Sequence, residues 1–152
     1  MAYWLMKSEP DVYGIDHLQR DGSTLWDGIR NYQARNFMRS MQIGDRAFFY
    51  HSNTKPPGIV GLMEVVETEI VDPSQFDPNS KYFDPAASLQ KPRWDCCRLR
   101  YLRHFKQLLS LDALRENFSP EQLGVVKRGN RLSILPVEPS SAERLLELLE
   151  SP

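Results

Sequence analysis

The stretch from Trp26 to Arg39 carries residue types that bind a flat, negatively charged ligand. It holds one tryptophan, an Asp-Gly pair and three arginines, Arg30, Arg35 and Arg39. An aromatic face can stack on a nucleobase, and guanidinium groups form strong hydrogen bonds to phosphate. The same residues also suit a tryptophan packed in the core beside a solvated basic surface. Types and spacing therefore leave two interpretations open, a binding site or a packing tryptophan.

A short helix is predicted inside this stretch. Four apolar residues share one sector at about 100° per residue, namely Ala34, Phe37, Met38 and Met41. Arg30 would fall in the same sector, so we predict that the helix begins after it, with Asn31 as the N-cap. The unpaired N–H groups of that N-terminus could receive an anion or a polar ring edge.

Other polar and aromatic residues could complete a site. Lys7 and Ser8 follow a short apolar run and precede Pro10, so they lie at the end of a predicted strand. Tyr82 and Trp94 are candidate aromatic walls, although such residues more often pin a loop or fill a core.

A basic turn near the C-terminus adds three cations, Lys127, Arg128 and Arg131. It is a solvated turn unless the fold places it beside Trp26. The sequence alone does not fix that distance.

Metal chemistry is not expected. Cys96 and Cys97 are adjacent, and His17, His51 and His104 are scattered, so neither set has the spacing of metal ligands. His51 ends a predicted buried strand, which favours a hydrogen-bonded structural histidine over a catalytic base. We expect no cofactor and no disulfide.

Composition limits the class of protein. The chain has 152 residues, of which 41% are hydrophobic and 26% charged, with a net charge of −1. These values are typical of one globular domain covering residues 1–152, and they give no global attraction to polyanions. Apolar runs are far shorter than the roughly 20 residues of a membrane span, and no signal peptide is apparent. We expect a cytoplasmic monomer with no membrane partner.

The predicted elements indicate an α+β fold. Five strands are expected at residues 3–6, 46–51, 59–71, 94–104 and 132–137, and short helices at 15–19, 111–117, 120–123 and 142–149. Residues 72–92 form an irregular loop rich in proline and aromatic residues, which we expect to be ordered. This pattern predicts a small curved β-barrel of about five or six strands surrounded by short helices.

Several of these segments together resemble the EVE domain, a family of the PUA-like superfamily. The matching stretches include YWLMKSEP at 3–10, WDGIRNYQARNFMR at 26–39 and RLSILPV at 131–137, with shorter matches at 44–45, 49–53, 58–61, 72–73, 82–85 and 92–94. The resemblance implies a PUA-like barrel with a pocket related to that of YTH domains, which read a methylated adenine in RNA. Lys7 and Ser8 followed by a tryptophan look like the corresponding residues of that pocket. Animal EVE proteins are associated with modified cytosines in DNA.

The resemblance gives roles to the candidate residues. Trp26 would supply a stacking face, while Asn31 and Ser8 would read a base edge. Asp27 would either accept from an exocyclic amine or cap the turn that it forms with Gly28, and we favour the turn. Phosphate contacts would come from Arg30, Arg35 and Arg39, with Lys7, Lys127, Arg128 and Arg131 as outer candidates. The ligand set is completed by Tyr82 and Trp94.

Three functions follow as hypotheses. The first is a binding module that reads a modified base in DNA or RNA: methylated or hydroxymethylated cytosine, or methylated adenine. The alternative is a small hydrolase of modified nucleosides, because related ASCH domains act through a Lys, a hydroxyl residue and a Glu, types present at Lys7, Ser8 and Glu9. On a strand, however, Ser8 would face away from its two neighbours. The third is a protein-interaction domain that keeps the pocket only as a relic.

Overall fold

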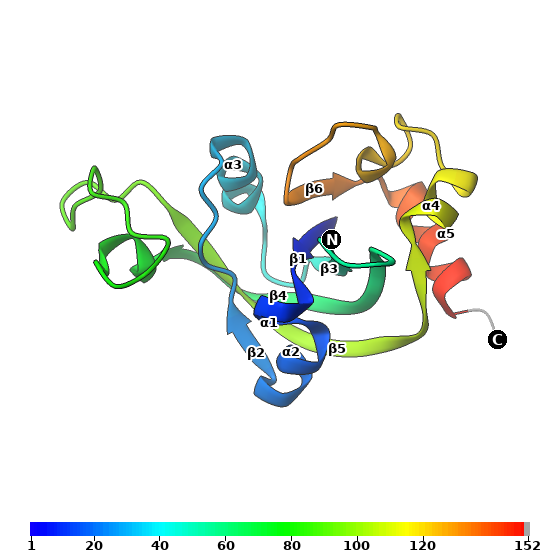
Figure 1. Ribbon diagram of the computed structural model, residues 1–152, viewed down its shortest axis with the longest axis horizontal. Coiled ribbons are helices and arrows are strands. Elements are labelled where there is room, and N and C mark those ends of the chain that lie inside the picture. The colour runs from blue at the N-terminus through cyan, green and yellow to red at the C-terminus, as the bar shows by residue number, and fades with distance from the viewer. Residues whose placement is uncertain (151–152) are drawn as a thin grey trace.

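A strongly curved mixed sheet forms the centre of the computed structural model, which describes residues 1–150 (Figure 1). Its strands are β1 (Tyr3–Ser8), β2 (Ser23–Leu25), β3 (Arg46–His51), β4 (Gly58–Val71), β5 (Asp95–Ser110) and β6 (Ile134–Val137). The sheet order is β2-β5-β4-β3-β1-β6, with β1 parallel to β3 and the other neighbours antiparallel. The expected α+β architecture is therefore confirmed, and β2 and β6 are the two ends of the sheet.

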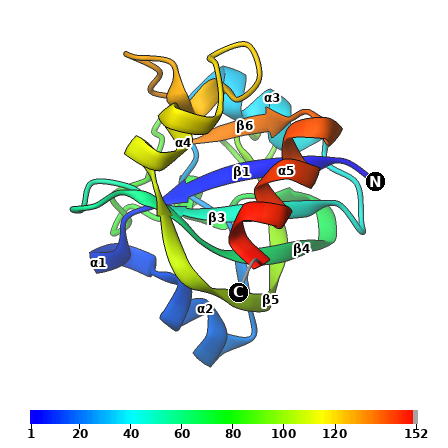
Figure 2. The ribbon, with the colours of Figure 1, turned by 90° about the vertical axis from the view of Figure 1, so that its right-hand side faces the viewer.

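Helices cover both faces of this sheet (Figure 2). They are α1 (Pro10–Tyr13), α2 (Ile15–Asp21), α3 (Tyr32–Ser40), α4 (Leu111–Asn117) and α5 (Pro139–Glu150), with 3-10 turns η1 (Pro73–Phe76) and η2 (Gly124–Val126). Alternating residues of β1 divide between two hydrophobic cores: Trp4 and Met6 lie in one, and Leu5 lies in the other. The first core includes residues of α2 and α3, and the second includes residues of α4 and α5. A strand buried on both faces reads as a continuous apolar run, which is the pattern seen in β1 and β3.

The predicted central helix is confirmed as α3. Asn31 is its N-cap, and the Asn31 side-chain oxygen accepts the Ala34 N–H at 3.0 Å. Ala34 and Met38 are buried, while Arg30 lies outside the helix. The N-cap residue and the apolar sector are local features of the sequence, and together they define where α3 begins.

The long strands β4 and β5 give the sheet its curvature. Their pairing shifts register at several points, including between Val65 and Glu67. Each such bulge bends and twists a strand. Because β4 supplies partners along its whole length, β5 continues to Ser110, well beyond the predicted end at His104.

Several predicted boundaries were wrong. Residues 120–123 form turns, and the nearby helical segment is the 3-10 turn η2. The short strand β2 was missed because it owes its form to antiparallel pairing with β5. Similarly, β1 extends beyond the predicted residue 6 to Ser8 because β3 pairs with it as far as His51. Helix α5 begins at Pro139, three residues before its predicted start.

The loop after β4 is ordered around one buried amide. Gln75 is fully buried, and its Nε2 donates to the carbonyls of Asp72 and Trp94 at 2.7 and 2.8 Å. Its Oε1 accepts the N–H groups of Arg93 and Trp94. One side chain thus joins both ends of the loop. Among residues 1–150, no helix combines the length and apolarity needed to cross a bilayer.

Candidate functional site

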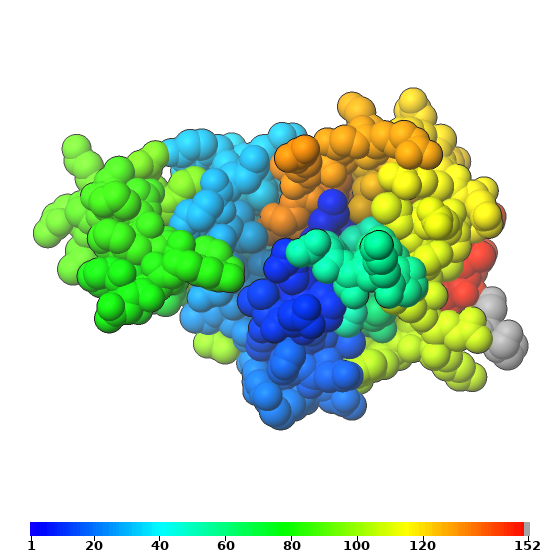
Figure 3. Space-filling model, in the orientation of Figure 1, coloured from blue at the N-terminus to red at the C-terminus, as the bar shows by residue number. Residues whose placement is uncertain are grey.

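A cavity of about 710 Å³ lies where segments distant in sequence meet. Its walls come from the end of β1, from α1, from the Trp26 loop, from the long loop and from the segment before β6. In Figure 3 the N-terminal residues, the light-blue stretch that leads into α3 and the orange segment before β6 meet on one face, beside the green long loop. The lining residues are Lys7, Ser8, Glu9, Val12, Tyr13, Thr24, Leu25, Trp26, Asp27, Gly28, Ile29, Arg30, Ser52, Lys81, Tyr82, Arg131 and Ser133.

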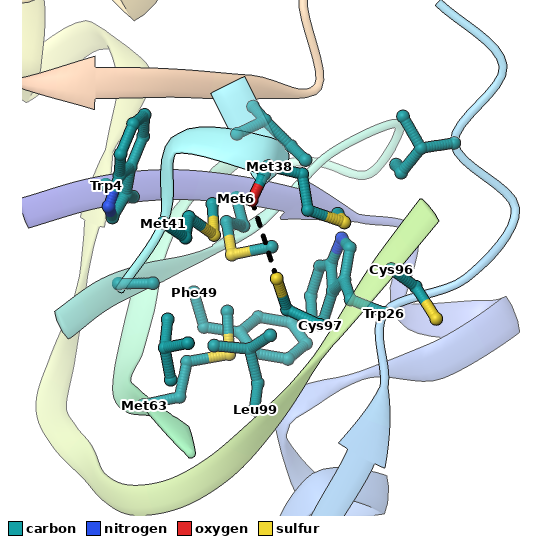
Figure 4. Packing of buried hydrophobic residues seen from close by; sticks show 14 of the residues in the cluster. Trp4, Met6, Trp26, Met38, Met41, Phe49, Met63, Cys96, Cys97 and Leu99 are labelled. Atoms are coloured by element: carbon teal, nitrogen blue, oxygen red, sulfur yellow. Dashed lines mark hydrogen bonds between the residues drawn. The ribbon is translucent and has the colours of Figure 1, made fainter. Parts of the chain in front are cut away.

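Trp26 belongs both to the core and to the cavity wall. It is 7% exposed, and its ring meets Phe49 edge-on with centroids 5.4 Å apart (Figure 4). Trp26 is therefore a packing tryptophan, one of the two interpretations that the sequence left open, and it also lines the cavity. Its indole N–H donates to none of the described residues. Among those residues, the one side-chain nitrogen or oxygen that is fully buried without a partner is Arg46 Nε. The indole nitrogen does not belong to that class and is therefore not fully buried.

Gly28 brings the aromatic ring of Tyr82 to the cavity. The residue has φ of +77°, a conformation that favours glycine. A Cβ at this position would lie 2.6 Å from Cε2 of Tyr82, so only a glycine admits the ring so close. The Gly28 N–H donates to Asp72 Oδ2 at 2.9 Å. The acceptor for the Gly28 N–H in this turn is therefore Asp72, 44 residues further along the chain, and not the Asp27 side chain.

Arg30 joins the Trp26 loop to the long loop. Its guanidinium donates five hydrogen bonds, to Ile29 O, to Asp72 Oδ2, to Ser74 Oγ and twice to Tyr82 O. An arginine side chain has five N–H donors, so none remains for a phosphate. The geometry makes Arg30 a structural part of the cavity wall and corrects its assignment as a phosphate contact.

Polar groups of β1 reach the same cavity. Lys7, Ser8 and Glu9 all line it, although alternation suggested that Ser8 would face away. The Ser8 hydroxyl donates to Tyr13 O at 2.6 Å, so only its acceptor capacity remains for a ligand. Burial lowers the pKa of Lys7 from its ordinary value.

Asp27 is one of the residues that line the cavity. The residue keeps an exposed surface, yet burial by the surrounding wall and then the Asp72 charge raise the pKa of its carboxyl group. No described side chain donates a hydrogen bond to it or forms an ion pair with it. A hydrogen bond from the residue's own backbone N–H opposes this shift in pKa.

The basic turn is divided between the cavity and the surface. Arg131 and Ser133 line the cavity, and the backbone N–H of Lys7 donates to Ser133 O at 2.8 Å. Lys127 and Arg128 are exposed and do not line it. Arg131 therefore lines the same cavity as Trp26, a proximity that the sequence alone did not fix.

Besides Lys127 and Arg128, four predicted site residues lie outside this cavity. The Asn31 side-chain oxygen caps α3, and Arg35 donates to Arg93 O at 3.0 Å. Trp94 is buried, stacks on Tyr32 at 4.9 Å and donates to Asp84, so it does not form a cavity wall.

Arg39, the fourth, forms an ion pair with Asp95. Both line a separate cavity of about 370 Å³, together with Cys96 and Cys97. Burial raises the pKa of each cysteine thiol to about 12, so both remain protonated and unreactive near neutral pH.

Sequence reasoning missed Asp72, Lys81 and Ser133. Asp72 is fully buried and holds the two loops together, although its only local signal was an Asp-Pro pair. Ser133 follows Arg131 by two residues, the spacing that returns to one face of an extended chain. Lys81 precedes Tyr82 and carried no local signal. Among residues 1–150, His, Cys, Asp and Glu form no group able to hold a metal ion.

Comparison with known proteins agrees with this fold. The model of the EVE domain family matches residues 2–148. Thymocyte nuclear protein 1 of Rattus norvegicus is 38% identical over 98% of this chain and 74% of its own length. Human THYN1, crystallised in complex with 5-methylcytosine-containing DNA, is 36% identical, with a TM-score of 0.93 over 100% of this chain and 99% of that one. The YTH domain-containing protein mmi1, solved with RNA, shares the fold at a TM-score of 0.56 and 12% identity, over 97% of this chain and 80% of its own. The chain belongs to the EVE domain family.

Proposed function

We propose that this protein binds nucleic acid and reads a modified base that is turned out of its strand into the cavity. The observation that carries the proposal is the grouping of Trp26 and Tyr82 with three cations, Lys7, Lys81 and Arg131, around one hollow of about 710 Å³. None of these cations forms an ion pair with a described carboxylate. A flipped base needs an aromatic surface, polar groups at its edge and cations for the adjacent phosphates.

The solved relative supports the same conclusion. Human THYN1 was crystallised with DNA containing 5-methylcytosine, and it matches this chain over its full length. We therefore place DNA with a modified cytosine first among the ligands. RNA with a modified base is the second possibility.

Each part of the cavity has a physical role in this proposal. Stacking on an aromatic ring contributes roughly 1–3 kcal/mol per base, which Tyr82 and Trp26 can supply. Lys81 and Arg131 lie on different segments of the wall and can contact phosphates on either side of the flipped nucleotide. Since the net charge is −1, these local cations must supply the electrostatic attraction.

Binding of oligonucleotides that differ at one base tests the proposal. The set contains 5-methylcytosine, 5-hydroxymethylcytosine or cytosine in DNA, and N6-methyladenine or adenine in RNA. We expect wild type to prefer one modified base. Tyr82→Ala should weaken that binding at least tenfold through lost stacking. Phe83→Ala is the matched control, because Phe83 is the next residue of the same loop and does not line the cavity.

Trp26 requires a milder change because it also packs on Phe49. Trp26→Phe keeps an aromatic ring but removes the indole N–H, and thermal melting checks that the variant is folded. Equal affinity for every modified and unmodified oligonucleotide would refute the reader function. Equal losses from Tyr82→Ala and Phe83→Ala would refute this cavity as the site.

A second candidate function rests on Lys7. Its amine has a lowered pKa, and it lines the cavity with Ser8 and Glu9, the residue types of the related hydrolases. A lowered pKa increases the share of the neutral amine, the form that can act as a nucleophile or a base. Incubation with acylated and methylated nucleosides tests this function. Product formed by wild type and lost in Lys7→Met would establish it, and no product from the whole panel would exclude it for these substrates.

A further inference from the structure

We infer that Asp27 makes the cavity selective for a base with an exocyclic amine, of the cytosine type, over its carbonyl analogue thymine. The inference rests on the proposed function and names the feature of the base that is read. It comes from the one lining carboxylate that lacks a described side-chain partner, since Glu9, the other lining acid, accepts from Asn53 Nδ2 at 3.0 Å.

The neighbours of Asp27 explain why its carboxylate is available. The backbone N–H of Gly28 donates to Asp72. All five N–H donors of Arg30 bond to acceptors other than Asp27. Asp27 therefore lies beside strong donors that are already satisfied. An acid in such a place can only accept from its own backbone, from water or from a ligand.

The chemistry of the base edge then sets the preference. Cytosine presents its N4 amine as a donor, whereas thymine presents the O4 acceptor at the same place. An ionised carboxylate accepts from the amine and repels the carbonyl oxygen. The N3–H of thymine does not offset this loss, because two carbonyl oxygens flank it. A base stacked near Trp26 can place its amine at the neighbouring residue.

The cavity also supplies donors for the rest of a cytosine edge. The N3 and O2 atoms are acceptors, and the cationic side chains of Lys7 and Arg131, residues that line the cavity, have no described acceptor. One carboxylate among several donors complements a base with one amine and two acceptors. The 5-methyl group does not take part in this distinction.

Three DNA oligonucleotides that differ at one position test the inference: 5-methylcytosine, thymine and cytosine. The first two carry the same methyl group and differ at the amine. We expect wild type to bind 5-methylcytosine at least tenfold more tightly than thymine. Asp27→Asn keeps the size of the side chain and permits its amide to donate, so the ratio should fall about tenfold or more.

A matched control separates charge from recognition. Asp112→Asn makes the same chemical change at an exposed residue of α4, on a different part of the molecule. Loss of one negative charge by Asp112→Asn should strengthen binding of all three oligonucleotides to the same extent. Only Asp27→Asn should change the ratio of 5-methylcytosine to thymine.

The outcomes distinguish the inference from the function on which it rests. A wild-type preference for 5-methylcytosine over cytosine supports base reading. If that preference is present but Asp27→Asn leaves the thymine ratio unchanged, the inference fails and the reader function stands. If wild type does not separate 5-methylcytosine from thymine, Asp27 does not read an amine. If all three oligonucleotides bind equally, both the function and the inference fail for DNA.

Discussion

The ring of Tyr82 occupies the space that any side chain at residue 28 would need. A Cβ on Gly28 would lie 2.6 to 2.8 Å from three ring carbons, distances that real contacts do not reach. The two residues come from different loops, and their contact places an aromatic surface at the cavity.

This contact predicts that Gly28→Ala weakens oligonucleotide binding by displacing the Tyr82 ring. The substitution also strains a backbone with φ of +77°. Gly44→Ala is the control, because Gly44 has φ of +96° and nothing within 4 Å of its Cβ position. Both variants should lose about 1–3 kcal/mol of stability, measured by urea denaturation, through backbone strain. Only Gly28→Ala should lose affinity beyond what unfolding explains. Equal affinity of the two variants would show that the ring position does not matter.

The Arg30–Asp72 ion pair is predicted to hold the two loops together. Asp72 has no exposed side-chain surface and Arg30 has 22%. Arg30→Ala leaves a buried carboxylate without its cation, which costs about 3–5 kcal/mol. Arg20→Ala removes an exposed pair, with 67% and 37% exposure, and should lower stability far less because solvent screens such a pair. Similar losses in the two variants, measured by chemical denaturation, would contradict this structural role.

Two arginines of one basic turn are predicted to differ in nucleic-acid binding. Arg131 lines the cavity and Arg128 does not. Arg131→Ala should reduce the slope of log affinity against log salt by about 0.9 on duplex DNA, or about 0.7 on a single strand. Arg128→Ala should change this salt-dependence slope less. A larger effect from Arg128 would place the phosphate path outside the cavity.

His51 is predicted to make stability depend on pH. Its Nε2 accepts the Ile15 N–H at 3.1 Å, and this bond requires a neutral ring. Burial lowers the pKa of His51 below 6.5, with Asp16 opposing the shift and His104 adding to it. The unfolded chain therefore binds the proton more readily, so this contribution is complete above about pH 6.5 and is lost as pH falls toward the lowered value.

His51→Gln tests this dependence, because an amide oxygen can accept from Ile15 but does not titrate. The free energy of unfolding, measured from pH 8 to pH 5, should fall less steeply in the variant than in wild type. Identical slopes would show that another group is responsible.

Sequence alone determined the local features of this protein. Asn31 was identified as the N-cap of α3 because a short polar side chain and an apolar sector within ten residues define that boundary. Pro10 predicted that the first strand ends near Lys7 and Ser8. A single apolar run predicted β3. These features depend on neighbours along the chain.

Tertiary structure decided which residues line the cavity and which of their hydrogen-bond donors are free. Trp26 is in the core as well as at the wall because Phe49 of β3 lies beside it. The donors of Arg30 are used because the sheet returns the long loop, with Asp72 and Tyr82, to the Trp26 loop. Likewise, the Lys7 backbone bonds to Ser133, which brings Arg131 to the cavity. The physical reason is that a side chain's free donors depend on partners more than 40 residues away, and local periodicity carries no information about them.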